Sequence, residues 1–244
     1  MKKEHVFSVI ALLVIWQLLA MKAANDILIP YPLETLIRTI TLFRSASFYM
    51  TVGSTLLRVF RGFMLSFIAA LLISIVSERF SAFRLLMEPL ILIARTIPNI
   101  SYIVIALIWL GAEGAVSAVS FMILFPVFAN AFINRLSNVE QELKEAELLY
   151  PETFFVRLKL RILPDLIPEM IATGRTAAGL GLKVGIMAEI LGQVRRGIGR
   201  SMNYSRLNLD TAGIVAWTIV IILLSVMTDK VFDWLQAQRM KEEL

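Results

Sequence analysis

The chain alternates between long apolar runs and short polar stretches. Six apolar runs stand out, at residues 6–20, 55–77, 85–110, 115–133, 167–191 and 212–228. A helix needs about 20 predominantly apolar residues to cross a bilayer, and only helices or closed barrels satisfy their backbone there. The pattern therefore predicts an all-α polytopic membrane protein with six transmembrane helices.

The first run and the stretch after it form a region of their own, residues 1–53. Lys2 and Lys3 precede the run, so it resembles a signal peptide, but Lys22 lies where small residues would mark a cleavage site. We interpret it as a retained span. Between it and the second run, a short amphipathic helix is expected at the outer surface, with these residues on its apolar face: Leu33, Leu36, Ile37, Ile40 and Phe43.

Charged and proline residues interrupt several of the later runs. Arg58 and Arg61 lie in the first two turns of the second span, where we expect their side chains to reach the interface. The third run is broken by the segment 95–99, and the fourth carries Pro126 and Asn130. Because the third run contains Arg95 and Pro98, we expect it to face protein or water rather than lipid.

A charged segment, Val139–Pro164, separates the fourth run from the fifth. Its apolar residues follow a helical spacing on both sides of Pro151, and proline bends the chain because it restricts the residue before it and suits the first turn of a helix. The segment therefore predicts two short amphipathic helices that form a hairpin between the fourth and fifth spans. Such an element, held against a membrane, has the shape of a docking site.

The composition argues against soluble catalysis. The chain is 58% hydrophobic and 18% charged, with no cysteine and one histidine, whereas ordinary soluble domains are roughly 45–50% apolar and about 25% charged. Thiolate metal sites and disulfides are thus excluded, and His5 at the extreme N-terminus is a poor general base. The pI of about 9.6 fits basic residues that flank spans better than it fits nucleic acid.

Here the docking segment resembles the permease subunits of bacterial ABC importers. Their motif is Glu-Ala-Ala, three residues, Gly, nine residues, then aliphatic residues ending in Leu-Pro. This chain has Glu145-Ala146-Glu147 and, at the same spacing, Ile162-Leu163-Pro164. It departs at Glu147 and at Pro151, which replaces a glycine that admits φ > 0, a conformation that proline cannot adopt.

Further motifs follow in the family order, over about residues 54–234. They are Arg95-Thr96-Ile97-Pro98, Leu107-Ile108-Trp109-Leu110-Gly111, Phe125-Pro126 with Asn130, Ala188-Glu189-Ile190-Leu191 and Gly197-Ile198-Gly199. The set is similar to the nitrate, taurine and aliphatic-sulfonate branch of these permeases. The resemblance implies a permease core at 54–234 with a coupling hairpin at 139–164, and a cytoplasmic tail at 235–244.

The resemblance also implies partners. The chain has no P-loop motif, so ATP and Mg²⁺ belong on two ATPase subunits rather than on this chain. A second permease copy would complete a homodimer with the pore on its two-fold axis, and an extracytoplasmic binding protein would deliver a small solute, with a slight preference for an anion. The N-terminal lysines and the docking segment place both termini in the cytoplasm, at the inner membrane.

The fifth span carries the most informative residues. Ala177, Gly181 and Gly185 recur every four residues and predict a face for close helix packing. Lys183 and Glu189 lie in the same span, and intramembrane charges are functional candidates by default. We therefore select four pore or gate candidates: Arg95, Lys183, Glu189 and Asn130. The alternative for the charged residues is internal ion pairing, of Glu189 with Arg95 or Lys183, or of Arg95 with Glu88.

Two further groups of residues are candidates for partner contacts. After the fifth span, Arg195, Arg196 and Arg200 either attract an anion or contact an acidic binding protein, unless they belong to a solvated loop that meets lipid headgroups. The candidates for coupling to the ATPase are Glu145, Ala146, Leu149, Tyr150, Pro151 and Phe154. Two other classes of function stay open at this point: a membrane-embedded enzyme that uses Arg95, Lys183 and Glu189 on lipid, and an ion-driven secondary transporter.

Overall fold

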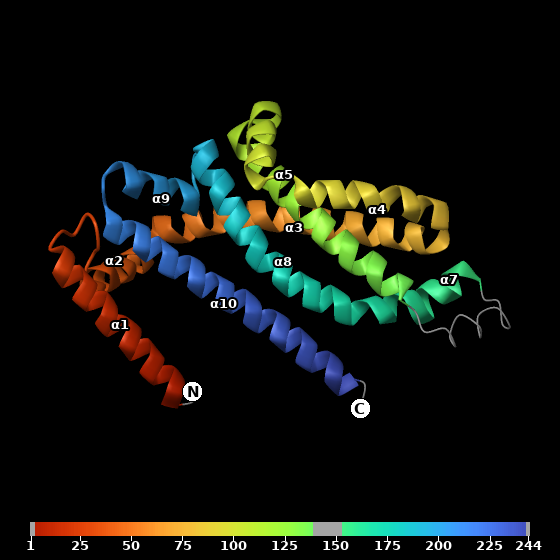
Figure 1. The fold of residues 1–244 in the computed structure, drawn as a ribbon, viewed down its shortest axis with the longest axis horizontal. Coiled ribbons are helices and arrows are strands. Elements are labelled where there is room, and N and C mark those ends of the chain that lie inside the picture. The colour runs from red at the N-terminus through yellow and green to blue at the C-terminus, as the bar shows by residue number, and fades with distance from the viewer. Residues whose placement is uncertain (1–2, 139–152, 243–244) are drawn as a thin grey trace.

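The computed structural model describes residues 3–138 and 153–242, and every regular element in these ranges is a helix (Figure 1). The helices before the docking segment are α1 (Lys3–Ala23), α2 (Pro32–Arg44), α3 (Ala46–Arg79), α4 (Ser81–Thr96) and α5 (Asn99–Ser137). The last part of the docking segment forms α7 (Phe154–Arg157) and the π-helical turn η1 (Leu158–Ile162), and α8 (Leu163–Gly192), α9 (Ile198–Leu207) and α10 (Thr211–Glu242) follow. The all-α prediction is confirmed.

Helices α3, α5 and α8 form the centre of the molecule, and small residues let them approach closely (Figure 1). A Cβ added at Gly181 would lie 3.1 Å from Leu124 of α5 and 3.3 Å from Val59 of α3. At Gly62 of α3 it would lie 2.5 Å from the carbonyl oxygen of Ser117. The predicted small-residue face of α8 is thus confirmed as a packing face, since any larger residue there would push the helices apart.

The chain breaks at both places that the sequence indicated around the third and fourth predicted spans. The break within the third run is confirmed, because α4 ends at Thr96 and Ile97, which precedes Pro98, adopts an extended conformation. The boundary expected near residue 111 is present as well, because two helical stretches meet within α5 across a kink at Gly111, the one non-helical residue inside this element. Gly111 lies in the left-handed region, at φ 67°, and turns the helix there. Glycine adopts this conformation without a steric penalty.

The remaining helices surround this centre at its periphery. The amphipathic helix predicted before the second span is confirmed as α2. Trp16 of α1 donates a hydrogen bond to the carbonyl of Pro30, two residues before α2 begins. After the fifth span, where a solvated loop was one alternative and no helix was predicted, residues 198–207 form α9. This helix was missed because it is short and mostly polar, and therefore lacks a strong apolar period.

Within residues 3–138 and 153–242, three helices are long and apolar enough to cross a membrane: α3, α5 and residues 211–239 of α10. The apolar part of α1, Ile10–Ala23, is shorter than these. Helix α8 has sufficient length at 30 residues but carries several charges. The start of α1, the end of α10 and helix α7 lie toward one end of the bundle, and α9 lies toward the other (Figure 1). We call the end that carries α7 the inner end and the opposite end the outer end.

Candidate functional site

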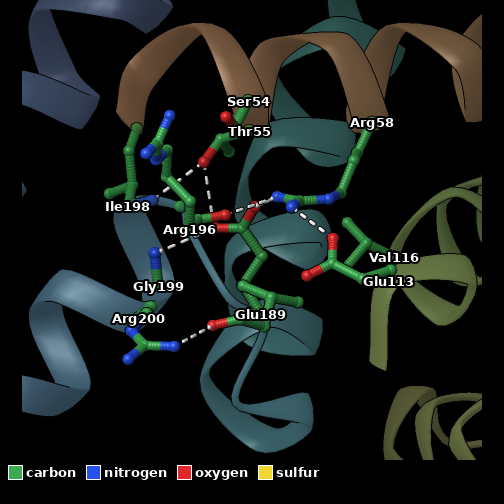
Figure 2. A network of polar contacts seen from close by, with 12 residues as sticks. Ser54, Thr55, Arg58, Glu113, Val116, Glu189, Arg196, Ile198, Gly199 and Arg200 are labelled. Atoms are coloured by element: carbon green, nitrogen blue, oxygen red, sulfur yellow. Dashed lines mark hydrogen bonds and ion pairs between the residues drawn. The ribbon is translucent and has the colours of Figure 1, made fainter. Parts of the chain in front are cut away.

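A polar network joins the outer ends of the three central helices (Figure 2). We define this outer network by its side chains, Thr55 and Arg58 of α3, Glu113 of α5 and Glu189 of α8. The Arg58 guanidinium donates to Glu189 Oε1 at 2.8 Å and to Glu113 Oε2 at 2.5 Å. It also donates to the carbonyl oxygen of Arg196 at 2.8 Å. One guanidinium therefore links two helices and the loop that follows α8.

The carboxylate of Glu189 is the most buried charge in the outer network. Its side chain is 0% exposed and that of Arg58 is 12% exposed. In addition to the ion pair, Glu189 Oε2 accepts hydrogen bonds from Thr55 Oγ1 and from the Gly199 amide, each at 2.9 Å. Thr55 Oγ1 in turn accepts from the Ile198 amide at 2.8 Å. A buried carboxylate is tolerated only when it is paired and hydrogen-bonded, and both conditions are met here.

Two glycines allow the loop to reach this carboxylate. A Cβ added at Gly197 would lie 2.5 Å from Cδ of Glu189, and one at Gly199 would lie 2.5 Å from the carbonyl oxygen of Ile186. Both distances are shorter than any van der Waals contact. The Gly-Ile-Gly motif is therefore explained by close approach of the backbone to α8.

The four pore or gate candidates do not form a single cluster. Arg95 and Asn130 line a cavity of about 260 Å³ between α4 and α5, together with Glu88. Lys183 lies on the exposed face of α8. Glu189 belongs to the outer network. The expected pairing of Glu189 with Arg95 or Lys183 is wrong, because Arg58 is its partner; Glu88, the other expected partner of Arg95, pairs with Arg84.

The three arginines after α8 lie at a second cavity, of about 450 Å³, at the outer end. Its lining brings four arginines together with aromatic and hydroxyl groups, and includes Arg38, Arg195, Arg196, Arg200, Thr51, Ser201, Tyr204 and Trp217. We call it the outer cavity. Asp210 pairs with Arg38 at 2.8 Å, and the other three arginines leave the lining strongly positive. An anion is the ligand that this lining favours.

Of the coupling candidates, five (Glu145, Ala146, Leu149, Tyr150 and Pro151) lie outside the described residues. Phe154 begins α7 and is half-buried against Phe155, with 5.9 Å between the ring centroids. The expected apolar face after Pro151 is only partly buried: Ile162 is enclosed in the core, whereas Phe155 is 79% exposed. The helix also does not end before the fifth span, because α7 passes through η1 into α8.

Ion pairs tie this segment to the central helices at their inner ends. Glu78 of α3 accepts from Arg157 at 3.0 Å and from Arg161 at 3.1 Å. Arg135 of α5 pairs with Asp165 at the start of α8. We call these five residues the inner cluster. It connects α7 and η1, the last part of the docking segment, to α3, and it connects the start of α8 to α5.

Sequence reasoning missed the residues that hold both clusters together. Arg58 was expected to reach the interface, and this is wrong, because it is turned inward between Glu113 and Glu189. Glu78 and Glu113 were not selected at all. A signal was present, since Arg58, Glu113 and Glu189 are three charges within or beside apolar runs, and such charges pair with one another. Which charges pair cannot be read from spacing alone, because they lie on different helices.

Comparison with known proteins gives a consistent set of relatives. Residues 62–241 match the family described as the binding-protein-dependent transport system inner membrane component. The formylaminopyrimidine transport permease protein ThiX of Halalkalibacterium halodurans is 25% identical, over 88% of this chain and 86% of that protein. The permease protein SsuC of Bacillus subtilis, provisionally named for the transport of aliphatic sulfonates, is 21% identical over 94% of this chain and 84% of that protein. The taurine transport system permease protein TauC of Escherichia coli is 22% identical over 90% of this chain and 82% of that protein.

Proposed function

The chain belongs to the family of inner membrane components of binding-protein-dependent transport systems and is a multi-pass permease subunit of an ABC importer; we propose that its cargo is a small anion of the sulfonate class. The outer cavity is the observation that carries this proposal, because Arg195, Arg196 and Arg200 line it together. Guanidinium groups bind planar and tetrahedral oxyanions through several donors in a fixed geometry. Two of the relatives are named for sulfonates or taurine, which is itself a sulfonate.

In this proposal the outer cavity receives cargo from an extracytoplasmic binding protein. It measures about 450 Å³ and has Tyr204 and Trp217 in its wall beside the arginines. A positive, partly enclosed surface raises the local concentration of an anion. The same arginines would also be in position to contact an acidic binding protein during delivery. An acidic binding protein and an anionic cargo are compatible here because they act at successive stages.

The permease is proposed to work as a homodimer whose path runs along the exposed face of α8. Lys183, Thr176 and Met187 are exposed on that face, and a Cβ at Gly179 would meet nothing within 4 Å. A lysine within a span is costly in lipid, so this face requires protein or water opposite it. Lys183 would then line the path, and Arg95 with Asn130 would form a second polar station toward the inner end.

Energy would come from two ATPase subunits that bind ATP and Mg²⁺ and press on segment 139–164 from the cytoplasm. The inner cluster supports this role, since Glu78, Arg157 and Arg161 would pass a displacement of that segment to α3. Exposed apolar residues in the described part of this segment, Phe155 and Leu160, offer contact surface for a partner. Both termini would then lie in the cytoplasm.

The cargo is tested by uptake into vesicles that contain the permease, its ATPase and its binding protein. We expect ATP-dependent uptake of taurine or a short alkanesulfonate, and about a tenfold decrease for Lys183→Ala, since a desolvated anion loses a charge-assisted contact. Lys22→Ala, remote from the proposed path, is the control. Uptake of a neutral heterocycle with no uptake of sulfonates would refute the cargo assignment.

The docking role is tested by Tyr150→Asp. A new carboxylate on an apolar docking face should weaken binding of the ATPase and separate ATP hydrolysis from uptake, because a buried unpaired charge is costly. The ratio of cargo moved to ATP hydrolysed measures this directly. Normal coupling in the variant would contradict the assignment of segment 139–164.

The path is tested by crosslinking, for which the absence of cysteine in the sequence is an advantage. Single cysteines at Gly179 and, as a control, at Ile222 on the exposed face of α10 can be compared directly. We expect a Gly179→Cys crosslink between two copies and none from Ile222→Cys. The reverse result would place α10, not α8, at the two-fold axis.

A further inference from the structure

A third cavity lies at the inner end and belongs neither to the proposed path nor to the outer cavity. It has a volume of about 400 Å³ and is lined by residues of α3, α4, α5 and η1. Its lining is mostly polar and comprises Ser74, Ser77, Glu78, Ser81, Arg84, Leu85, Ile133, Leu136, Ser137 and Arg161. We call it the inner cavity. A water molecule occupies roughly 30 Å³, so there is room for a polyatomic anion with part of its hydration shell.

One lining side chain has a hydrogen-bonding capacity that the described protein does not use. Ser77 is 3% exposed, and its Oγ is buried with no partner among the described residues. Leaving a buried hydroxyl unpaired costs free energy, and such a group requires an explanation. The neighbouring serines differ, because Ser74 donates to the carbonyl of Leu71 at 2.8 Å and Ser137 to that of Ile133 at 2.6 Å.

The helix that starts at this cavity also lacks a cap. Helix α4 has 16 residues and begins at Ser81, and Phe80 at its N-cap makes no side-chain capping hydrogen bond. No acidic residue lies in its first turn. The first amides of a helix have no partner within the helix, and they favour a negative charge. The open end of α4 and the hydroxyl of Ser77 are thus two independent donors at one cavity.

The charged residues of the lining are compatible with an anion. Arg84 pairs with Glu88 on its own helix, an exposed pair at i and i+4 that contributes little and is easily exchanged. Glu78 is the acidic member of the lining, and both of its oxygens are already engaged by Arg157 and Arg161. Its charge is therefore compensated by two guanidinium groups.

We propose that the inner cavity binds a tetrahedral oxyanion, sulfate or a phosphate group, between Ser77, the N-terminus of α4 and Arg84. The end of α5 and the turn that carries Arg161 line the same cavity. An anion bound there would therefore connect them to the α3–α4 turn. Since Arg161 belongs to the inner cluster, the bound anion would restrain η1, the last part of the docking segment. This regulatory consequence rests on the proposed docking role, whereas the binding itself does not.

Binding is tested on the full chain, purified and delipidated, by following its unfolding midpoint during titration with sodium sulfate. Sodium chloride at matched ionic strength corrects for screening, and comparison of variants corrects for the general stabilising effect of sulfate. Ser77→Ala should weaken the sulfate effect about fivefold, because one hydrogen bond is lost. Arg84→Gln should weaken it by more than about tenfold.

Ser74→Ala is the matched control. Its hydroxyl proton is already donated within α3, and sulfate only accepts hydrogen bonds, so this variant should retain the wild-type response. Without sulfate, Ser77→Ala should be as stable as the wild type or slightly more stable, since the hydroxyl that it removes has no partner. Correct folding of the variant can thus be checked independently of binding.

A second arm identifies the source of the anion. Phospholipid that remains bound per chain is counted by native mass spectrometry, in the wild type and in the same variants. A selective loss of lipid in Ser77→Ala and Arg84→Gln supports a headgroup phosphate, and a selective loss of the sulfate effect supports a free oxyanion. If both variants match the wild type in both arms, the proposal is wrong, and this outcome leaves the transport function untouched.

Discussion

The outer network and the inner cluster join the same three helices at opposite ends, but they do so in different ways. At the outer end, Glu189 is fully buried and is bound by a hydroxyl and a backbone amide as well as by Arg58. At the inner end, Arg135 and Asp165 are substantially exposed, and Arg157 and Arg161 are linked to Glu78 through side chains. A backbone amide, such as the one bound to Glu189, has no rotamer to change and holds its partner in place. The long side chains of Arg157 and Arg161 can change rotamer and exchange partners.

This difference fits the two ends of a transporter that is driven from one side. In the proposed mechanism, a displacement of segment 139–164 would first reach ion pairs that can shift, and these would transmit it to α3 and α8. At the outer end it would reach a network that resists separation of α3, α5 and α8. The three helices should therefore pivot about the outer network rather than slide past one another.

The largest effect is expected from removing the carboxylate of the outer network. Glu189→Ala leaves Arg58 largely buried with one carboxylate fewer, and breaking a buried pair in this way costs about 3–5 kcal/mol. For a chain of this size that corresponds to a decrease of roughly 6–20 °C in the unfolding midpoint. The midpoint of the purified full chain, followed by a thermal shift assay, measures it.

The control for that experiment is Glu88→Gln. Glu88 also pairs with an arginine, but on the surface of α4, and such pairs contribute about 0.3–0.5 kcal/mol. A double variant, Arg58→Met with Glu189→Leu, should recover part of the lost stability, because apolar residues often replace a buried pair without loss. If Glu88→Gln is as damaging as Glu189→Ala, the outer network is not the pivot.

The next largest effect concerns the glycine that approaches Glu189. Gly197→Ala brings a methyl group within 2.5 Å of the carboxylate carbon of Glu189, and overpacking of this kind costs about 1–3 kcal/mol. Gly53→Ala is the matched control, because a Cβ there meets nothing within 4 Å and the site is inside α3. Alanine stabilises a helix interior by about 0.5–1 kcal/mol relative to glycine. We therefore expect the unfolding midpoint to fall in Gly197→Ala and to rise in Gly53→Ala, relative to the wild type.

The fold and the site were predictable from the sequence to different degrees. The helical class, α2, the break before Pro98 and the packing face of α8 follow from local signals, namely apolar period, proline and small residues at fixed spacing. The partner of Glu189 does not, because Arg58 lies 131 positions away in the sequence. Likewise, η1 joins α7 to α8 through tertiary contacts of Ile162, which no local pattern distinguishes from a helix end.

A smaller effect on stability, with a larger one on function, is expected at the inner end. Glu78→Gln removes the charge that Arg157 and Arg161 share, at a side chain that is only 9% exposed, and should cost about 1–2 kcal/mol through weaker hydrogen bonds to the two guanidinium groups. The ratio of cargo moved to ATP hydrolysed should nevertheless fall severalfold, because α3 is then less firmly connected to the docking segment. Glu34→Gln in α2, remote from the inner end, is the control. Unchanged coupling in Glu78→Gln would exclude the inner cluster from transmission.

The smallest effect, and the one that sharpens the comparison most, is the response to salt. At 1 M salt the Debye length is about 3 Å, against about 10 Å at 0.1 M, and exposed pairs are screened far more than buried ones. The destabilisation caused by Arg135→Gln, which removes the exposed pair with Asp165, should be a few tenths of a kcal/mol and should disappear at 1 M sodium chloride. That caused by Glu189→Ala should persist. Equal salt sensitivity at the two ends would mean that the outer network opens to water as readily as the inner cluster, and a fixed pivot there would then be wrong.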